Sequence, residues 1–280
     1  MESMKIAAIK YVAGKSLEAE ETLAGEEALQ IKINGTPYTI TMRTPGQDAM
    51  LVAGLLFTER LINRAEDILN ISEIPAEHGG HTVIAEVQVR EETLAGKNLV
   101  NRSIASNASC GVCGKIELCD LLTPEKALLT AETLDIEHIP HLLSQMQAAQ
   151  LTFDKTGGSH AAAIFRIDGK LLSVKEDIGR HNAVDKVIGD LLLRDQLHEA
   201  AILFVSGRTS YEIASKCGEA SIPFLLGVSA PSSLAAEYCR RKGITLIGFC
   251  RENRATVYVN EKRIKVRNNR INSAHYHEAE

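Results

Sequence analysis

The chain contains no tryptophan, and aromatic residues make up only 4% of its 280 residues. A protein that binds single-stranded nucleic acid by stacking bases on aromatic rings would have little to work with. The formal net charge of -5 gives no general attraction to nucleic acid or to an anionic membrane. Long apolar runs are missing too: the stretch 200–205 is far too short to cross a bilayer, and residues 1–10 lack the layout of a signal peptide. We therefore expect a cytoplasmic protein that binds neither nucleic acid nor membrane.

What the chain does have is a CxxC pair, Cys110 and Cys113, flanked by glycines. Glycine lets the backbone turn and lets a bulky partner come close, which a buried structural thiol would not need. Lys115 adds a positive charge that favours thiolate over thiol. Dithiol redox centres, half zinc sites, cluster ligands and sulfur carriers all use this motif, so these residues alone leave four alternatives open.

The remaining four thiols are interpreted as reduced side chains, because disulfides are rare in the cytosol. Their apolar or helical surroundings indicate packing as small hydrophobic groups. Cys250 also lies at the ligand-binding edge predicted below. The four residues are Cys119, Cys217, Cys239 and Cys250.

Length and composition indicate one large domain with a smaller companion. Hydrophobic residues make up 45% and charged residues 24%, which is ordinary for a globular protein that buries a sizeable core. The predicted divisions are a small β-rich unit over 1–109, a CxxC loop and connection over 110–137, an α/β domain over 138–262 and a disordered tail over 263–280.

Periodicity organises the first half. Residues 31–33 and 38–42 alternate in polarity around Asn34-Gly35, which is a strong hairpin signal. The same reasoning predicts a helix from 45–48 to Phe57, a strand over 83–89, a polar connection over 98–109 and a helix over 138–150 whose apolar stripe is Ile139, Leu142, Leu143 and Met146.

The second half alternates between helices and short apolar strands, which is typical of an α/β fold with a mainly parallel sheet. A hairpin is expected first, with strands over 161–166 and 171–174 around Asp168-Gly169. Strands are then predicted over 201–205, 223–228 and 244–247, separated by helices over 183–193, 211–220 and 233–242.

Small, hydroxyl and arginine residues follow each of these three strands, in the segments 206–210, 229–233 and 248–251. Open α/β sheets bind ligands at the carboxyl ends of their strands. Ser232 or Ser233 can cap a helix whose free N–H groups favour an anion, and three arginines offer forks suited to phosphate. The predicted ligand is therefore small and phosphorylated, and the arginines are Arg208, Arg251 and Arg254.

Two further clusters carry ionisable groups beside glycines. The segment 156–160 ends in His160, which taken alone is interpreted as a structural histidine. The segment 176–182 places Arg180 and His181 beside Asp177, an arrangement equally typical of a solvated helix start and of a ligand site. Its position just before a helix favours the ligand site.

Seven motifs in one order resemble those of the FdhD family, the sulfur-carrying accessory proteins of formate dehydrogenase. The resemblance runs from about Arg43 to Arg254, and its longest motif, EDIGRHNAVDK, is specific. The motifs are RTPG at Arg43, CGVCG at Cys110, TGGSHAA at Thr156, EDIGRHNAVDK at Glu176, SGRTSYE at Ser206, SAPSSLA at Ser229 and GFCR at Gly248.

The resemblance implies a relay in which a cysteine desulfurase passes a persulfide to the CxxC loop, and the sulfur then goes to the molybdenum bis(molybdopterin guanine dinucleotide) cofactor of formate dehydrogenase. It also implies a homodimer and a large domain similar to the cytidine deaminase fold. Cys110 is the expected carrier and Cys113 its assistant, and no structural metal is expected. The predicted residues for the cofactor or a guanine nucleotide are Phe249, Cys250, Arg251, Glu252, Asn253, Arg254, Arg208, Ser232, His160, Arg180 and His181.

Three rival functions fit the residues less well. A zinc deaminase needs H-x-E followed by PCxxC, but here CxxC comes first and His160 precedes two alanines. A zinc-stapled binding module needs four ligands, and the sequence has no second CxxC. A thioredoxin-type oxidoreductase keeps its CxxC at the strand-to-helix turn of a βαβ unit, whereas this CxxC precedes a long linker. The dithiol oxidoreductase is the strongest rival among enzymes.

Overall fold

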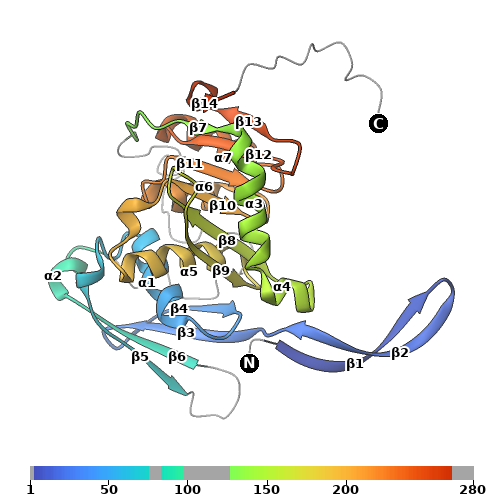
Figure 1. The fold of residues 1–280 in the computed structure, drawn as a ribbon. Coiled ribbons are helices and arrows are strands. Elements are labelled where there is room, and N and C mark those ends of the chain that lie inside the picture. The colour runs from blue at the N-terminus through green and yellow to red at the C-terminus, as the bar shows by residue number, and fades with distance from the viewer. Residues whose placement is uncertain (1–2, 76–82, 98–126, 267–280) are drawn as a thin grey trace.

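The computed structural model describes residues 3–75, 83–97 and 127–266, and it is a mixed α/β protein built on two main sheets (Figure 1). The larger sheet has six strands in the order β13-β12-β11-β10-β8-β9, and a smaller sheet has the order β4-β3-β6-β5. The large sheet comprises β8 (His160–Phe165), β9 (Leu171–Asp177), β10 (Ile202–Val205), β11 (Phe224–Gly227), β12 (Thr245–Gly248) and β13 (Thr256–Val259).

The three strands predicted with crossovers between them, β10, β11 and β12, are parallel as expected, and the predicted hairpin is formed by β8 and β9, but the sheet as a whole is mixed and not mainly parallel. Only β10, β11 and β12 run parallel to one another, while β8, β9 and β13 join in antiparallel pairs. The short connection through Gly169, which has a φ of 85°, is too tight for a parallel crossover and must reverse the chain. The same holds for the return from β12 to β13. The parallel crossovers are confined to the stretches that contain α6 (Tyr211–Glu219) and α7 (Ser233–Lys242).

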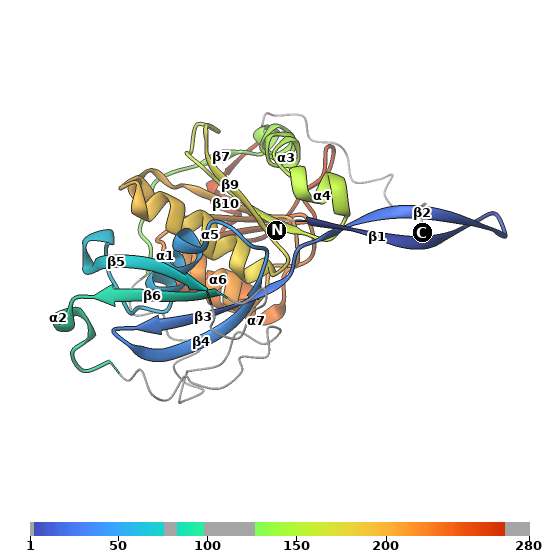
Figure 2. The same ribbon diagram turned by 90° about the horizontal axis from the view of Figure 1, so that it is seen from below.

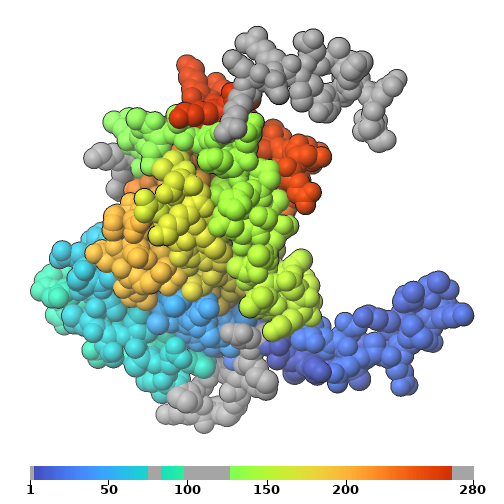
Figure 3. Space-filling model, viewed as in Figure 1, coloured from blue at the N-terminus to red at the C-terminus, as the bar shows by residue number. Residues whose placement is uncertain are grey.

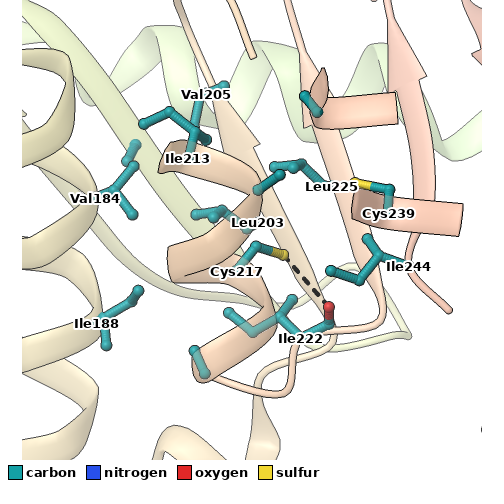
Figure 4. Close-up of a cluster of buried hydrophobic side chains, with 14 of the residues drawn as sticks. Val184, Ile188, Leu203, Val205, Ile213, Cys217, Ile222, Leu225, Cys239 and Ile244 are labelled. Carbon is teal, nitrogen blue, oxygen red and sulfur yellow. Dashed lines mark hydrogen bonds between the residues drawn. The ribbon is translucent and has the colours of Figure 1, made fainter. Parts of the chain in front are cut away.

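Successive side chains of each strand point to opposite faces of the large sheet. Both faces are apolar, and helices cover each of them. Leu203 and Val205 pack with α5 (Arg180–Leu193), α6 and α7 in one core, which Figure 4 shows in part. Ile202 and Phe204 join a second core on the opposite face. That second core is covered by α3 (Ile139–Ala148), whose predicted stripe is confirmed as its four buried residues.

Two of the predicted core thiols lie in the first of these cores. Cys217 and Cys239 are fully buried, and the Cys217 Sγ donates to the Ile222 carbonyl at 3.3 Å (Figure 4). Burial raises the pKa of both thiols, that of Cys239 to about 12. They are therefore packing groups and not nucleophiles.

The small sheet begins with the predicted hairpin, formed by β3 (Glu27–Ile33) and β4 (Thr36–Arg43). Asn34 and Gly35 both have positive φ values, 49° and 79°, which is the geometry that a two-residue hairpin turn needs. The sheet is completed by β6 (Val83–Val89) and β5 (Ile68–Pro75). The predicted helix is α1 (Asp48–Thr58), and together with α5 it lies between the two sheets (Figure 1).

A long hairpin that the sequence analysis did not identify precedes the small sheet. β1 (Ser3–Val12) and β2 (Lys15–Ala24) pair antiparallel over ten residue pairs, and they pair with no other strand of the described residues. We call this hairpin the arm. It projects from the body, and α4 (Leu151–Thr156) packs beside its root (Figure 2).

The remaining elements are short. β7 (Leu134–Asp135) pairs in parallel with β14 (Ile264–Lys265), and α2 (Glu91–Leu94) follows β6. The domain boundaries stay a prediction, although β14 places the first residues of the expected tail in a strand. The polar connection 98–109, Cys110, Cys113 and Cys119 lie outside the described residues. Within the described part, every helix is too short or too polar to cross a membrane.

Candidate functional site

The carboxyl ends of β10, β11 and β12 form a continuous edge whose loops bond to one another. The Thr209 N–H donates to the Ala230 carbonyl at 3.2 Å, and the Ser232 N–H donates to the Thr209 carbonyl at 2.9 Å. The Phe249 N–H donates to the Ser229 carbonyl at 3.2 Å. These bonds tie the three predicted loops into one surface, which we call the sheet edge.

Two glycines allow this close packing. A Cβ on Gly227 would lie 2.5 Å from the Thr209 Oγ1, and a Cβ on Gly248 would lie 2.9 Å from the Pro231 Cδ. Side-chain atoms do not approach at such distances, so any larger residue would push the loops apart. The glycines at these strand ends therefore shape the sheet edge and are not only turn formers.

The predicted arginines at the sheet edge are exposed. The Arg251 Nη1 donates to the Val228 carbonyl at 2.7 Å, which fixes one side of its guanidinium against the neighbouring loop. The Arg254 guanidinium lies 5.4 Å from the centre of the Phe249 ring, within the range of a cation–π contact. Phe249, the residue after β12, has a left-handed φ of 51°, so the chain turns sharply at the end of this strand. Arg208, Glu252 and Asn253 are exposed on the same loops.

Ser232 and Cys250 use their side chains internally. The Ser232 Oγ accepts from the Ala235 N–H at 3.2 Å, which confirms the expected cap of α7. The Cys250 side chain is fully buried in the core beneath the edge, and burial raises its pKa to about 12. Both residues therefore shape the sheet edge through the backbone, and Cys250 presents no thiol to a ligand there.

The second predicted group lies beside the first loop. His160 faces Asp177 in the β8–β9 pair, and a Cβ on Gly207 would lie 3.5 Å from the His160 Nδ1. Burial, followed by the charge of Arg180, lowers the pKa of His160 against the opposing effect of Asp177. His160 thus lies close to both the start of α5 and the 206–210 loop.

His181 lies one residue into α5, between charged groups. Burial lowers its pKa to about 3, and the positive charges of Arg180 and Lys216 and the proximity of His160 act in the same direction. The His181 Nε2 lies 3.9 Å from the Glu212 Oε2. Both histidines are therefore neutral at pH 7.

Four buried polar atoms near the N-termini of α5 and α6 lack a hydrogen-bond partner within the described part of the chain. Neither helix start has a side-chain cap there. Buried polar atoms in folded proteins almost always have a partner, so such a concentration marks a place suited to a ligand. The atoms are the Arg180 Nε, the His181 Nε2, the Thr209 Oγ1 and the Ser210 Oγ.

The acidic residues of the same sequence motif have a different role. The Glu176 carboxylate accepts from the Thr152 and Phe153 N–H groups at 2.7 and 2.8 Å, so it caps α4. Asp177 is fully buried and bonds the Lys186 Nζ at 2.7 Å and the Thr44 N–H at 3.1 Å. These two residues hold the elements around the site together.

Arg43 is likewise structural. It is almost fully buried and forms a two-pronged pair with Asp48, through Nε at 2.9 Å and Nη2 at 2.8 Å. Its Nη1 also donates to Glu27 at 3.2 Å. Arg43 therefore fastens β3 and β4 to the start of α1, and the next residue of the motif, Thr44, bonds Asp177 as described above.

Two polar groups that the sequence analysis did not select lie under the site. Glu212 faces His181 as described above, and Lys216 bonds both carboxylate oxygens of Asp185 at 2.8 Å. Glu212 and Lys216 are four residues apart, which places both on one face of α6, and this spacing is the sequence signal that could have identified them. Among the described residues, no three His, Cys, Asp or Glu side chains are grouped as metal ligands. The expectation of no structural metal stays a prediction.

The geometry thus defines an α/β protein whose arginine-rich sheet edge lies beside two neutral histidines. The model of the FdhD/NarQ family matches residues 24–265. The chain is 42% identical over 265 residues to the sulfur carrier protein FdhD of Mycolicibacterium paratuberculosis, covering 90% of this chain and 95% of the relative. Its identity to the protein of the same name from Thermoplasma acidophilum is 41%, covering 94% of each.

A solved structure agrees with these matches. A protein from Desulfotalea psychrophila, described as a formate dehydrogenase accessory protein, has a TM-score of 0.74 and 25% identity. The match covers 95% of this chain and all of the other. The chain belongs to the FdhD/NarQ family.

Proposed function

We propose that this protein carries sulfur during the maturation of formate dehydrogenase. The observation that supports this most directly is the family match over residues 24–265, together with relatives at about 40% identity that are named sulfur carrier proteins. The relatives are covered almost end to end, so the likeness extends to the whole chain and not to a shared domain. The homodimer, the cytoplasmic location and the cytidine-deaminase-like description of the large domain belong to the same proposal.

Cys110 is the proposed carrier. Its thiolate attacks the outer sulfur of a persulfide on a cysteine desulfurase, the new S–S bond forms on Cys110, and the desulfurase cysteine leaves as a thiolate. No net oxidation occurs in this exchange. In the release step, a thiolate such as that of Cys113 attacks the inner sulfur, forms a Cys110–Cys113 disulfide and supplies the two electrons with which the outer sulfur leaves as hydrosulfide. A dithiol reductant then restores the pair.

The proposed sulfur acceptor is the molybdenum bis(molybdopterin guanine dinucleotide) cofactor, bound as a substrate at the sheet edge. Arg251, Arg254 and Arg208 offer guanidinium groups to its pyrophosphate arms. The uncapped N-terminus of α5 and the Arg180 Nε favour negative charge in the same neighbourhood. His160 and His181 are neutral at pH 7, so each can donate or accept a hydrogen bond without adding charge.

Intact-mass measurement after incubation with a desulfurase and cysteine tests the carrier. The wild-type protein should gain one sulfur atom, and peptide mapping should place it on Cys110 and not on the buried thiols Cys217, Cys239 and Cys250. Cys110→Ala should lose this gain and all maturation of formate dehydrogenase with an unchanged urea midpoint. Cys113→Ala should be impaired less.

Full maturation by Cys110→Ala would overturn the assignment. Equal dependence on both thiols would favour the dithiol oxidoreductase, and stoichiometric zinc by elemental analysis would favour the zinc-stapled module.

A further inference from the structure

Glu212 is a nearly buried carboxylate at the sheet edge to which neither the fold nor the proposed chemistry gives a role. It is the last residue of the motif that begins at Ser206, and its side chain is only 14% exposed in the first turn of α6. The helix N-terminus attracts this negative charge, yet within the described part of the chain no N–H or O–H group donates to it. Burying a carboxylate without donors is costly, so Glu212 has acceptor capacity that suits a ligand.

The groups near Glu212 lack partners as well. Its Oε2 lies 3.9 Å from the His181 Nε2, which is too far for a hydrogen bond, and that buried nitrogen has no other partner among the described residues. The Ser210 Oγ and the Arg180 Nε are buried and unpartnered in the same part of the chain. Thr209 is fully buried, and its Oγ1 is unpartnered there too. Much hydrogen-bonding capacity is therefore unused in one place.

The mixture of donors and acceptors decides the class of ligand. A phosphate group is negatively charged and would be repelled by Glu212, whereas a cation would be repelled by Arg180. A neutral group that carries adjacent donors and acceptors suits both, because its N–H groups can donate to the carboxylate and its acceptor atoms can receive the Arg180 Nε–H. His181 is neutral, so its Nε2 can take either role.

A heterocycle with a 2-amino-oxopyrimidine edge carries this pattern. Its ring N–H and its amino group are two adjacent donors, which match the two oxygens of one carboxylate. Its oxo group and the ring nitrogen beyond it are acceptors. Guanine and pterin share this edge, and both occur in the cofactor that is proposed above as the sulfur acceptor.

The position of Glu212 suits a base whose phosphates lie on the arginines of the sheet edge. α6 follows β10, and Arg251 follows β12, two strands further along the sheet. Neighbouring strands lie about 4.8 Å apart, so these strand ends are separated by roughly 10 Å, which a nucleoside can bridge. α3 packs on the opposite face of the sheet from α6, on the side seen in Figure 3, and therefore does not cover the start of α6.

We propose that Glu212 determines which heterocycle the sheet edge accepts, by receiving hydrogen bonds from the ring N–H and the 2-amino group of guanine or pterin. His181, Arg180 and Ser210 complete the contact. This inference rests on the proposed function, which places the cofactor at the sheet edge, and it adds the residue that selects the base. Glu212 is a specificity-determining residue and takes no part in sulfur transfer.

Calorimetry with nucleoside diphosphates that differ only at C2 of the base tests the guanine. The wild type should bind GDP about tenfold or more tighter than IDP, which lacks the amino group. Glu212→Gln should remove this preference. It should also shift the ratio of affinities from GDP toward xanthosine diphosphate by about a hundredfold or more, because the glutamine N–H can donate to the 2-oxo group. A gain for one ligand cannot come from loss of folding.

Glu219→Gln is the matched control. Glu219 lies at the other end of α6, away from the sheet edge, and its side chain is 15% exposed, nearly as for Glu212. Its carboxylate is paired with Arg60. The control variant should therefore keep the wild-type ratios of affinity among the three nucleotides.

Neopterin, titrated into the same proteins, distinguishes the two sources of the edge. If Glu212 contacts the pterin, Glu212→Gln should weaken neopterin binding about tenfold or more and leave the ratio of GDP to IDP affinity unchanged. A Glu212→Gln variant that binds all four ligands as the wild type does would overturn this inference alone. A wild-type protein that binds neither GDP nor neopterin would overturn the proposed nucleotide site as well, while sulfur loading of Cys110 tests the carrier separately.

Discussion

Burial decides the charge of the histidines at the sheet edge. The pKa of His181 lies at about 3 in the folded protein, against 6.5 for an unperturbed histidine. Between these values the unfolded chain binds a proton that the folded protein does not. The contribution of His181 to stability is therefore fully present above about pH 6.5, and it is lost as the pH falls toward 3.

Replacing this histidine should flatten the acid dependence of stability. In the wild type, the low pKa of His181 should make the free energy of unfolding about 2 kcal/mol smaller at pH 5 than at pH 7. His181→Gln should remove that difference, because glutamine does not titrate. The free energy of unfolding in urea, measured for both proteins at pH 7 and pH 5, checks this.

His141→Gln at an exposed position of α3 is the control. It should keep the wild-type pH dependence, because an exposed side chain loses little hydration on folding. An unchanged slope in His181→Gln would mean that the imidazole is charged in the folded protein.

At the scale of elements, the contact between α1 and α5 joins the two main sheets. A Cβ on Gly54 would lie 1.9 Å from the Asp185 carbonyl oxygen, and a Cβ on Gly189 would lie 1.9 Å from that of Met50. The two helix backbones therefore touch, and glycine is required at both points. Beside this contact, Asp185 is held by Lys216 and by the Thr58 hydroxyl at 2.8 Å.

A single methyl group at either glycine should separate these helices. Gly54→Ala and Gly189→Ala are each expected to lower the free energy of unfolding by about 3 kcal/mol or more, because the clash is with backbone and cannot be relieved by a rotamer change. Gly158→Ala is the matched control, since its nearest neighbour would be the Ala24 Cβ at an ordinary 3.4 Å. Equal stability of all three variants would show that the helices slide apart without cost.

At the scale of the whole molecule, the proposed sulfur carrier and the proposed nucleotide-binding edge belong to different parts of the chain. Cys110 is in the segment after the small sheet, whereas Arg251 and Arg254 follow β12 in the rigid large sheet. Loading of sulfur and binding of the cofactor should therefore be separable.

Paired variants test this separation. Arg251→Ala with Arg254→Ala removes two charge-assisted contacts, so affinity for GDP by calorimetry should fall about tenfold or more, while Cys110 still accepts sulfur. Cys110→Ala should bind GDP as the wild type does. Arg240→Ala with Arg241→Ala removes the same charge at the other end of α7 and should leave GDP affinity nearly unchanged. Loss of sulfur loading in the folded, dimeric Arg251 and Arg254 variant would favour one composite site.

The sequence by itself determined the local elements and the family. Asn34-Gly35 required a hairpin, the stripe from Ile139 to Met146 required one buried helix face, and hydroxyl and arginine residues after three strands marked the sheet edge. These signals depend on neighbours within a few positions, and so they can be detected without the fold. The seven ordered motifs were specific enough to indicate the FdhD family.

Only the tertiary structure decided which motif residues hold the fold and which lie at the candidate site. Glu176, Asp177 and Arg43 stand in motifs beside candidate ligand groups, yet each is held in a structural contact, with Phe153, Lys186 and Asp48 respectively. The mixed sheet and the burial of Cys250 were likewise decided there. Such outcomes depend on contacts between segments far apart in the chain, whose desolvation and pairing no local pattern records.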